Sequence, residues 1–229
     1  MLQDGTADRG PERGAMVTDR HLVIGLTGNL GAGKSTVGRI AGDLGARVID
    51  SDQTVRDLLT KESELASSIQ GAFGTEVMLD GRPDRAALAR IVFEDPGELA
   101  RLEKILYPRV GERTAELIAE PTSAPATVIE AIKIVEGPNV DRLHALWLVV
   151  APPDVQIKRA TATGRISAAE ARRRLAVQSS PDDKERLFRA RRPGLPVWRI
   201  HNSTDLQALQ RRVAAVWRET LAYGDGPTP

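Results

Sequence analysis

Eight consecutive residues combine the groups that proteins use to hold phosphate. Positions 28–35 read Gly-Asn-Leu-Gly-Ala-Gly-Lys-Ser, which matches the pattern G-x-x-x-x-G-K-[ST]. The glycines let backbone amides converge on phosphate oxygens, Lys34 reaches the β- and γ-phosphates, and the Ser35 hydroxyl can ligate Mg²⁺. The alternative is a glycine-rich turn without a ligand. The predicted nucleotide-binding residues are Asn29, Leu30, Gly31, Ala32, Gly33, Lys34, Ser35 and Thr36.

The sequence on either side of this loop predicts a strand before it and a helix after it. Residues 22–26 are an apolar run typical of a buried strand. Val37, Ile40, Ala41 and Leu44 recur at helical spacing. The amino end of such a helix favours bound anions through its free amides and its dipole. The motif therefore stands in the strand, loop and helix context that phosphate binding needs.

Two carboxylates lie at the carboxyl end of the second predicted strand, which we place at 46–50. This segment ends Val-Ile-Asp-Ser-Asp at 48–52, and ligands of open α/β sheets bind at the carboxyl ends of the strands. Strand alternation predicts that Asp50 and Asp52 point to the same side. One could then contact water on Mg²⁺ while the other accepts a proton from an acceptor hydroxyl. The alternative is that Asp-Ser-Asp caps a helix.

Basic residues gather in the segment 156–174, although the chain as a whole is nearly neutral. A basic lid over a phosphoryl-transfer site neutralises charge and excludes water. Arg159, close behind a predicted strand, is the stronger candidate, whereas Arg172 and Arg173 are equally well explained as a solvated helix face. Glu130, in a third predicted strand, is a candidate second-sphere Mg²⁺ ligand or a member of an ion pair. The basic residues of the segment are Lys158, Arg159, Arg165, Arg172, Arg173 and Arg174.

The order of predicted elements indicates an α/β protein with a five-stranded parallel sheet covered on both faces. Strands are predicted at 22–27, 46–50, 126–132, 145–150 and 197–201, and helices at 54–73, 84–94 and 96–119. One domain spans 21–223, with core segments 21–53, 121–157 and 181–223, a helical insert at about 54–120 and a lid at about 158–180. Residues 1–20 are predicted to be a disordered extension, with Met16 as a candidate start, and 224–229 a frayed tail.

Composition excludes several classes of protein. The 229 residues carry 32 Lys and Arg against 31 Asp and Glu, so no global basic field for nucleic acid is expected. No cysteine is present, which excludes disulfides and thiol chemistry. No apolar stretch approaches the roughly 18 residues that cross a bilayer. We expect a cytoplasmic protein without a membrane or nucleic-acid partner, and the oligomeric state is left open.

The chain resembles the dephospho-coenzyme A kinase family from residue 22 to about residue 222. The phosphate loop followed by Val-Ile-Asp-Ser-Asp is similar to the beginning of that family, and the insert and lid also match. The matching segments are Gly-Arg-Pro-Asp-Arg-Ala-Ala-Leu at 81–88, Ile-Val-Phe at 91–93, Leu-Glu-Lys-Ile at 102–105, Pro108, Gln156, Arg159, Arg174, Gln178 and Asn202.

This resemblance implies a three-layer phosphate-loop kinase fold and transfer of the ATP γ-phosphate to the ribose 3′-hydroxyl of dephospho-coenzyme A. The implied cofactors are ATP and Mg²⁺. Asp52 takes the position of the catalytic base, Lys34 and Ser35 serve phosphate and metal, and the helical insert binds the acceptor. Asp50 is a further candidate for the metal.

The chain departs from the family pattern at four places. Tyr107 stands before Pro108 where the family usually has histidine, and Ile-Lys-Ile at 132–134 replaces Pro-Leu-Leu. Pro-Val at 196–197 replaces an Ala-Asp pair. Thr163 occupies the usual lid-arginine position, and we expect Arg165, two residues later, to supply that charge as a catalytic residue together with Arg159.

Two other functions remain open at the level of sequence. A phosphate-loop kinase of nucleosides or nucleotides would share ATP, Mg²⁺ and the lid but differ in the insert. A degenerate nucleotide-binding module would bind without turnover. A GTPase is not supported, because the chain has neither N-K-x-D nor D-x-x-G.

Overall fold

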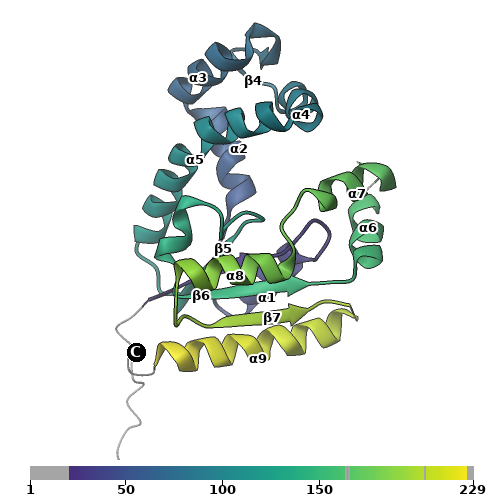
Figure 1. Cartoon of the computed structure of the whole chain (residues 1–229). Helices are drawn as coiled ribbons and strands as arrows, with labels where there is room; N and C mark the ends of the chain where they lie inside the picture. The colour runs from purple at the N-terminus through teal and green to yellow at the C-terminus, as the bar shows by residue number, and fades with distance from the viewer. Residues whose placement is uncertain (1–20, 163, 165, 204, 226–229) are drawn as a thin grey trace, which may run out of the picture.

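Five parallel strands form the central sheet in the computed structural model, which describes residues 21–162, 164, 166–203 and 205–225 (Figure 1). The strand order is β2-β5-β1-β6-β7. All neighbouring strands in this sheet pair in parallel. The strands are β1 (Leu22–Thr27), β2 (Arg47–Asp50), β5 (Ala126–Glu130), β6 (Ala145–Val150) and β7 (Val197–His201).

Strand register brings the ends of β1, β2 and β5 to one level of the sheet. Glu130, the last residue of β5, pairs with Leu26 of β1 on one side and with Asp50 of β2 on the other. The phosphate loop leaves β1 directly after this level, at Thr27. The predicted loop, Asp50 and Glu130 therefore meet at the carboxyl edge of the sheet.

Helices cover both faces of the sheet, which gives the three layers predicted from the sequence. Helices α1 (Lys34–Asp43) and α9 (Leu206–Gly224) pack on one face over Ile24, Val128 and Trp147. Helix α8 (Pro181–Arg191), the 3₁₀ helix η2 (Pro138–Arg142) and the end of α5 (Pro96–Ala119) cover the other. The Trp147 ring meets that of Trp217 edge-on, with 6.2 Å between centroids. The alternation of side chains along β1 supplies apolar groups to both layers.

The segment between β2 and β5 forms a helical lobe with its own hydrophobic core. Figure 1 shows this lobe projecting from the sheet, connected by α2 and by the long helix α5. The lobe core contains Leu58, Ile69, Phe73, Leu88 and Leu102. Its elements besides α5 are α2 (Ser51–Lys61), α3 (Ser63–Phe73), η1 (Thr75–Val77), β3 (Met78–Leu79), β4 (Arg82–Pro83) and α4 (Arg85–Glu94).

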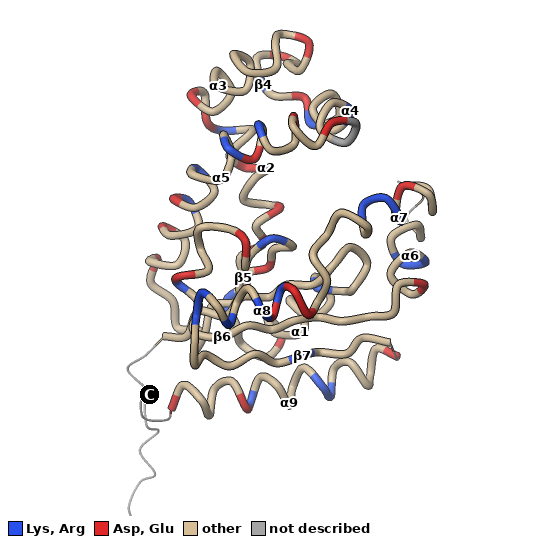
Figure 2. The backbone as a smooth tube through the Cα atoms, in the orientation of Figure 1, with Lys and Arg blue, Asp and Glu red and all other residues tan. Residues whose placement is uncertain are grey.

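Helices α6 (Pro153–Thr161) and α7 (Ala168–Ala176) form a second projection, separated from the lobe in Figure 1. The Ser167 side chain accepts a hydrogen bond from the Glu170 amide and so caps α7. Arg172 and Arg173 on α7 are exposed, and Arg173 pairs with Glu170. Figure 2 shows charges of both signs along α5 and α8.

Several predicted boundaries are wrong. The helix predicted at 54–73 is two helices, because Glu62 takes an extended conformation and its carboxylate binds Arg109 of α5 at 2.9 Å. The strand predicted to reach 132 ends at Glu130, because its neighbour β1 ends at Thr27. The Ile132 carbonyl accepts a hydrogen bond from the side chain of Thr27 rather than from a strand backbone. The short β3–β4 pair was not predicted.

The chain ends also differ from the prediction. Helix α9 continues to Gly224, which packs against Leu22, so the predicted tail at 224–229 begins too early. The predicted extension at 1–20 and residues 226–229 lie outside the described residues.

Candidate active site

The phosphate loop is held in place by three distant segments. Gly31 and Gly33 have φ of 71° and 98°, in the region that favours glycine. A Cβ at Gly31 would lie 2.2 Å from the Gln156 carbonyl oxygen, and one at Gly33 would lie 2.1 Å from Asn202 Nδ2. Side chains at these positions would therefore collide with α6 and with the residue after β7. Both glycines are required by close packing as well as by conformation.

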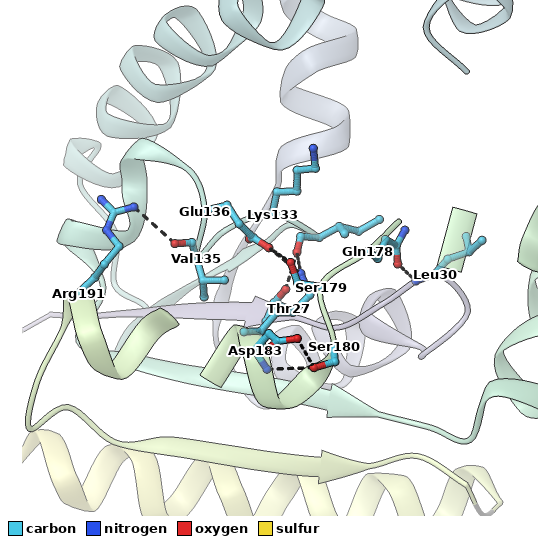
Figure 3. Close-up of polar contacts among 12 residues, drawn as sticks. Thr27, Leu30, Lys133, Val135, Glu136, Gln178, Ser179, Ser180, Asp183 and Arg191 are labelled. Carbon is cyan, nitrogen blue, oxygen red and sulfur yellow. Dashed lines mark hydrogen bonds and ion pairs between the residues drawn. The ribbon is translucent and has the colours of Figure 1, made fainter. Parts of the chain in front are cut away.

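Hydrogen bonds complete this support. The Asn202 side chain donates from Nδ2 to the Ala32 carbonyl over 2.8 Å. The Leu30 amide donates to Gln178 Oε1 over 2.9 Å (Figure 3). Asn202 follows the last strand, and Gln178 lies between α7 and α8. The loop is thus fixed by residues up to 170 positions away in sequence.

Lys34, Ser35 and Glu130 form the charged centre of the site. Lys34 Nζ donates to the Asn29 carbonyl at 3.3 Å, and Ser35 Oγ donates to Glu130 Oε1 at 2.7 Å. Burial lowers the pKa of Lys34, against the opposing charge of Glu130. Burial raises the pKa of Glu130, against the Ser35 hydrogen bond and the charge of Lys34. Both groups are therefore less favourably charged here than in water.

The two aspartates at the end of β2 and the start of α2 do not share the geometry that strand alternation predicted. Helix α2 begins at Ser51, so only Asp50 belongs to the strand. Asp50 Oδ1 caps α2 by accepting hydrogen bonds from the amides of Asp52 at 2.8 Å and Gln53 at 3.1 Å. Asp52 is exposed in the first turn of α2. Asp50 pairs in register with Glu130, whose carboxylate binds Ser35 of the phosphate loop, and the charges of Asp52 and Asp50 both oppose the lowering of the Lys34 pKa.

Arg159 links the lid helix α6 to the phosphate loop through Asn202. Its Nη1 donates to the Asn202 carbonyl at 2.9 Å, and its Nη2 donates to Asn202 Oδ1 at 3.3 Å. Asn202 in turn binds Ala32, as described above. The other predicted lid residue, Arg165, lies outside the described residues, as does Thr163.

Arg159→Ala is expected to raise the KM for ATP and to lower kcat/KM about tenfold or more, because two hydrogen bonds that position Asn202 are lost. The melting temperature should fall by only a few degrees. Steady-state kinetics and thermal unfolding measure both effects. Lys158→Ala, the exposed neighbour on α6, is the matched control. Equal kinetics of the two variants would contradict this role of Arg159.

A carboxylate on the lobe joins two of the residues that depart from the family pattern. Lys133 Nζ binds Glu103 Oε1 of α5 at 2.5 Å. Tyr107 also hydrogen-bonds Glu103, and burial together with that carboxylate raises the pKa of the Tyr107 hydroxyl. The lobe is thereby tied to the segment that follows β5.

A cavity of about 440 Å³ lies between the edge strand β2 and helices α2 and α5. Its wall contains both apolar and charged side chains. Asp50 at the end of β2 is one of its lining residues, so the cavity reaches the carboxyl edge of the sheet. The charged residues that line it are Arg47, Asp50, Asp57, Lys61, Glu62 and Arg113.

Sequence reasoning missed Lys184 altogether. This lysine of α8 is 1% exposed and donates from Nζ to the Ile132 carbonyl at 2.7 Å. Its segment is strongly polar, so no local signal distinguished it from the exposed residues of α8. The Ile132 carbonyl that it binds also accepts a hydrogen bond from Thr27 at the end of β1, so Lys184 lies close to the phosphate loop, and its charge adds to the lowering of the Lys34 pKa by burial.

Two structural findings concern metals and membranes. Among the described residues, no three histidine or acidic side chains gather into a group that could hold a metal ion. No helix in the described ranges is both long and apolar enough to cross a membrane.

Comparison with known proteins places the chain in one family over most of its length. The sequence model of dephospho-CoA kinase matches residues 22–192. The dephospho-CoA kinase of Geobacter metallireducens is 37% identical over 203 residues, covering 87% of this chain and 97% of its own. That of Thermobifida fusca is 37% identical over 199 residues, covering 86% and 96%.

Solved structures support the fold. The crystal structure of TT1252 from Thermus thermophilus has a TM-score of 0.69 at 32% identity, covering 88% of this chain and 98% of that one. The dephospho-CoA kinase from Campylobacter jejuni has a TM-score of 0.54 at 20% identity, covering 86% and 96%.

Proposed function

We infer, because the chain belongs to the dephospho-CoA kinase family, that it transfers the γ-phosphate of ATP to the ribose 3′-hydroxyl of dephospho-CoA, the last step of coenzyme A biosynthesis. The observation that supports this function is that the phosphate loop, Glu130 and the start of α2, which carries Asp52, lie together at the carboxyl edge of the sheet. This edge is where open α/β sheets bind their ligands.

We propose that Lys34 and the loop amides bind the β- and γ-phosphates of ATP. The ammonium of Lys34 is partly buried in the free protein, and phosphate oxygens would replace the Asn29 carbonyl as its partners. Arg159 acts beside the loop through Asn202. Arg165 is proposed as a second lid charge on the transferred group, following its place in the sequence.

Asp52 is proposed as the general base. It is exposed, it lies next to the phosphate loop, and its carboxylate is not the helix cap, which is Asp50. The acceptor oxygen forms a bond to the γ-phosphorus, the bond from that phosphorus to the β,γ-bridging oxygen breaks, and the proton of the acceptor hydroxyl passes to Asp52. ADP leaves with the electron pair of the broken bond.

Ser35 and Glu130 fit a Mg²⁺ ion that arrives with ATP. The Ser35 hydroxyl and the Glu130 carboxylate are hard oxygen donors 2.7 Å apart, and Glu130 is buried beside only a partly compensating cation. The ion would supply neutralisation of phosphate charge. Asp50 is a weaker candidate for the ion, since its Oδ1 is engaged by two backbone amides and its Oδ2 lies 3.6 Å from Arg56.

We propose that the acceptor enters between the lobe and the sheet. The cavity beside Asp50 has room for part of an adenylate or pantetheine group, and its wall offers both apolar and basic surface through Leu58 and Arg113. An acceptor held there would reach the carboxyl edge of the sheet close to Asp52.

Product analysis tests the function. The protein is incubated with Mg²⁺ and ATP and, in parallel, dephospho-CoA, adenosine, AMP or no acceptor. We expect coenzyme A and ADP in equal amounts with dephospho-CoA and little ADP in the other reactions. A higher kcat/KM for a nucleoside or nucleotide, or release of ADP without a phosphorylated acceptor, would overturn the proposal.

A further inference from the structure

The side chain of Lys184 is almost fully enclosed. It is 1% exposed, on the fourth residue of α8. A buried ammonium is retained only where its hydrogen-bond partners compensate for lost hydration. The hydrogen-bond partners of this side chain therefore indicate its structural role.

The contacts of Lys184 join three segments. Its Nζ donates to the Ile132 carbonyl at 2.7 Å and to Glu136 Oε1 at 3.2 Å. The Ile132 carbonyl also accepts a hydrogen bond from Thr27 Oγ1, at 2.8 Å, where β1 runs into the phosphate loop. Lys184 thus connects α8 with the end of β1 and with the segment after β5.

The second partner of Lys184 leads to the lid. Glu136 Oε1 also accepts a hydrogen bond from Ser179 Oγ at 3.1 Å, as Figure 3 shows. Gln178, the preceding residue, accepts the hydrogen bond of the Leu30 amide in the phosphate loop. The chain that returns from the lid is therefore held at two adjacent residues. Gln178 binds the phosphate loop, and Ser179 binds the carboxylate that Lys184 also binds.

Glu136 depends on this lysine. Its Oε2 is buried and has no hydrogen-bond partner within the described part of the chain. Lys184 is the cation that pairs with it, at 3.2 Å. Removal of the ammonium would leave a partly buried carboxylate uncompensated beside Ser179. It would also remove the bridge that joins Glu136 to the Ile132 carbonyl, so the return segment would lose its position.

We propose that Lys184 is a positioning residue for ATP. It fixes Glu136 and Ser179 so that Gln178 meets the Leu30 amide and the phosphate loop keeps its nucleotide-binding shape. The inference rests on the proposed function for its turnover assay, but its consequence for ATP binding is independent of the acceptor.

Lys184→Met tests this proposal, since methionine keeps most of the length and loses the charge. We expect the KM for ATP and the Kd for ATP measured by calorimetry without acceptor to rise about tenfold, with the KM for dephospho-CoA changed less than about threefold. Lys184→Arg should restore part of the ATP affinity. Arg186→Met, on the same helix and 75% exposed, is the matched control and should behave as wild type.

A double variant separates positioning from stability. Lys184→Met with Glu136→Gln removes both buried charges, and we expect its melting temperature to recover while its ATP affinity stays low. This variant also carries the test if Lys184→Met does not fold. Recovery of ATP affinity together with the melting temperature would overturn the proposal, as would an unchanged Kd for ATP in Lys184→Met.

A third variant tests the route of the effect. Gln178→Leu should reproduce the loss of ATP affinity, and combining it with Lys184→Met should add little, because both act on the same contact with Leu30. Additive losses would contradict that route. Failure of the proposed acceptor reaction would leave these ATP-binding measurements intact, so the two proposals fail separately.

Discussion

Lys34→Ala is expected to lower kcat/KM for phosphoryl transfer by on the order of 10³-fold or more, the scale seen when a preorganised charge on the transition state is removed. The ammonium lies in the phosphate loop and is oriented by the Asn29 carbonyl. No other residue of the loop carries a positive charge. Coupled measurement of ADP with dephospho-CoA as acceptor gives the rate.

The same variant should remain folded. Burial lowers the pKa of Lys34, so the folded protein binds this proton less tightly than the unfolded chain, whose pKa is near 10.5. The unfolded chain binds more protons between the lowered pKa and 10.5, so the Lys34 contribution to stability rises with pH across that window. Below the window its buried charge is unfavourable, and alanine relieves this cost.

Arg186→Ala is the control for Lys34→Ala. Arg186 is 75% exposed and pairs with Asp183 on α8, away from the residues that line the cavity. It should turn over as wild type does. Near-normal turnover of Lys34→Ala, or a collapse of its melting temperature, would refute the assignment of Lys34 to phosphate rather than to structure.

Asp52→Asn is expected to lower kcat by about 10²-fold or more with ATP binding retained, as for loss of a positioned general base. Asparagine preserves the size of the side chain, and the cap of α2 is untouched because Asp50 provides it. The measurements are single-turnover transfer to dephospho-CoA and ATP affinity by calorimetry.

Asp50→Asn is the matched comparison. Its side chain still accepts the hydrogen bonds of the Asp52 and Gln53 amides through the amide oxygen, so we expect a smaller loss of kcat. If Asp52→Asn turned over like wild type while Asp50→Asn did not, the two roles would have to be exchanged.

The strands were the most predictable part of the fold. The strands β1, β6 and β7 have the predicted bounds. β1 and β6 are short apolar runs, which is the pattern of a buried strand. The predicted end of β5 was wrong because apolar character continues past Glu130, where the backbone turns to meet Thr27 and Lys184. A run of apolar residues indicates burial rather than strand structure, and here the apolar run continues beyond the end of the strand.

The site was predictable as far as it is local. The phosphate loop was predicted from eight adjacent residues. Asn202 and Gln178, which bind the loop, matched the family pattern, but the sequence did not predict their contacts with it. Lys184 gave no signal, because a lysine enclosed by segments some 50 residues away looks like any polar helix residue in sequence. The prediction that Asp50 and Asp52 point to the same side was wrong, because Asp50 is both the last residue of β2 and the cap of α2.

The positions of the tryptophans determine which part of the molecule is followed by tryptophan fluorescence during unfolding. All three lie with the sheet and α9: Trp147 and Trp217 belong to that core and Trp198 packs against it, while the lobe core around Phe73 has none. Tryptophan emission during denaturation therefore follows the sheet alone, whereas far-ultraviolet circular dichroism follows the helices of both parts. A lobe that melts first would shift the dichroism curve ahead of the emission curve, and coincident curves would mean that the two hydrophobic cores unfold as one unit.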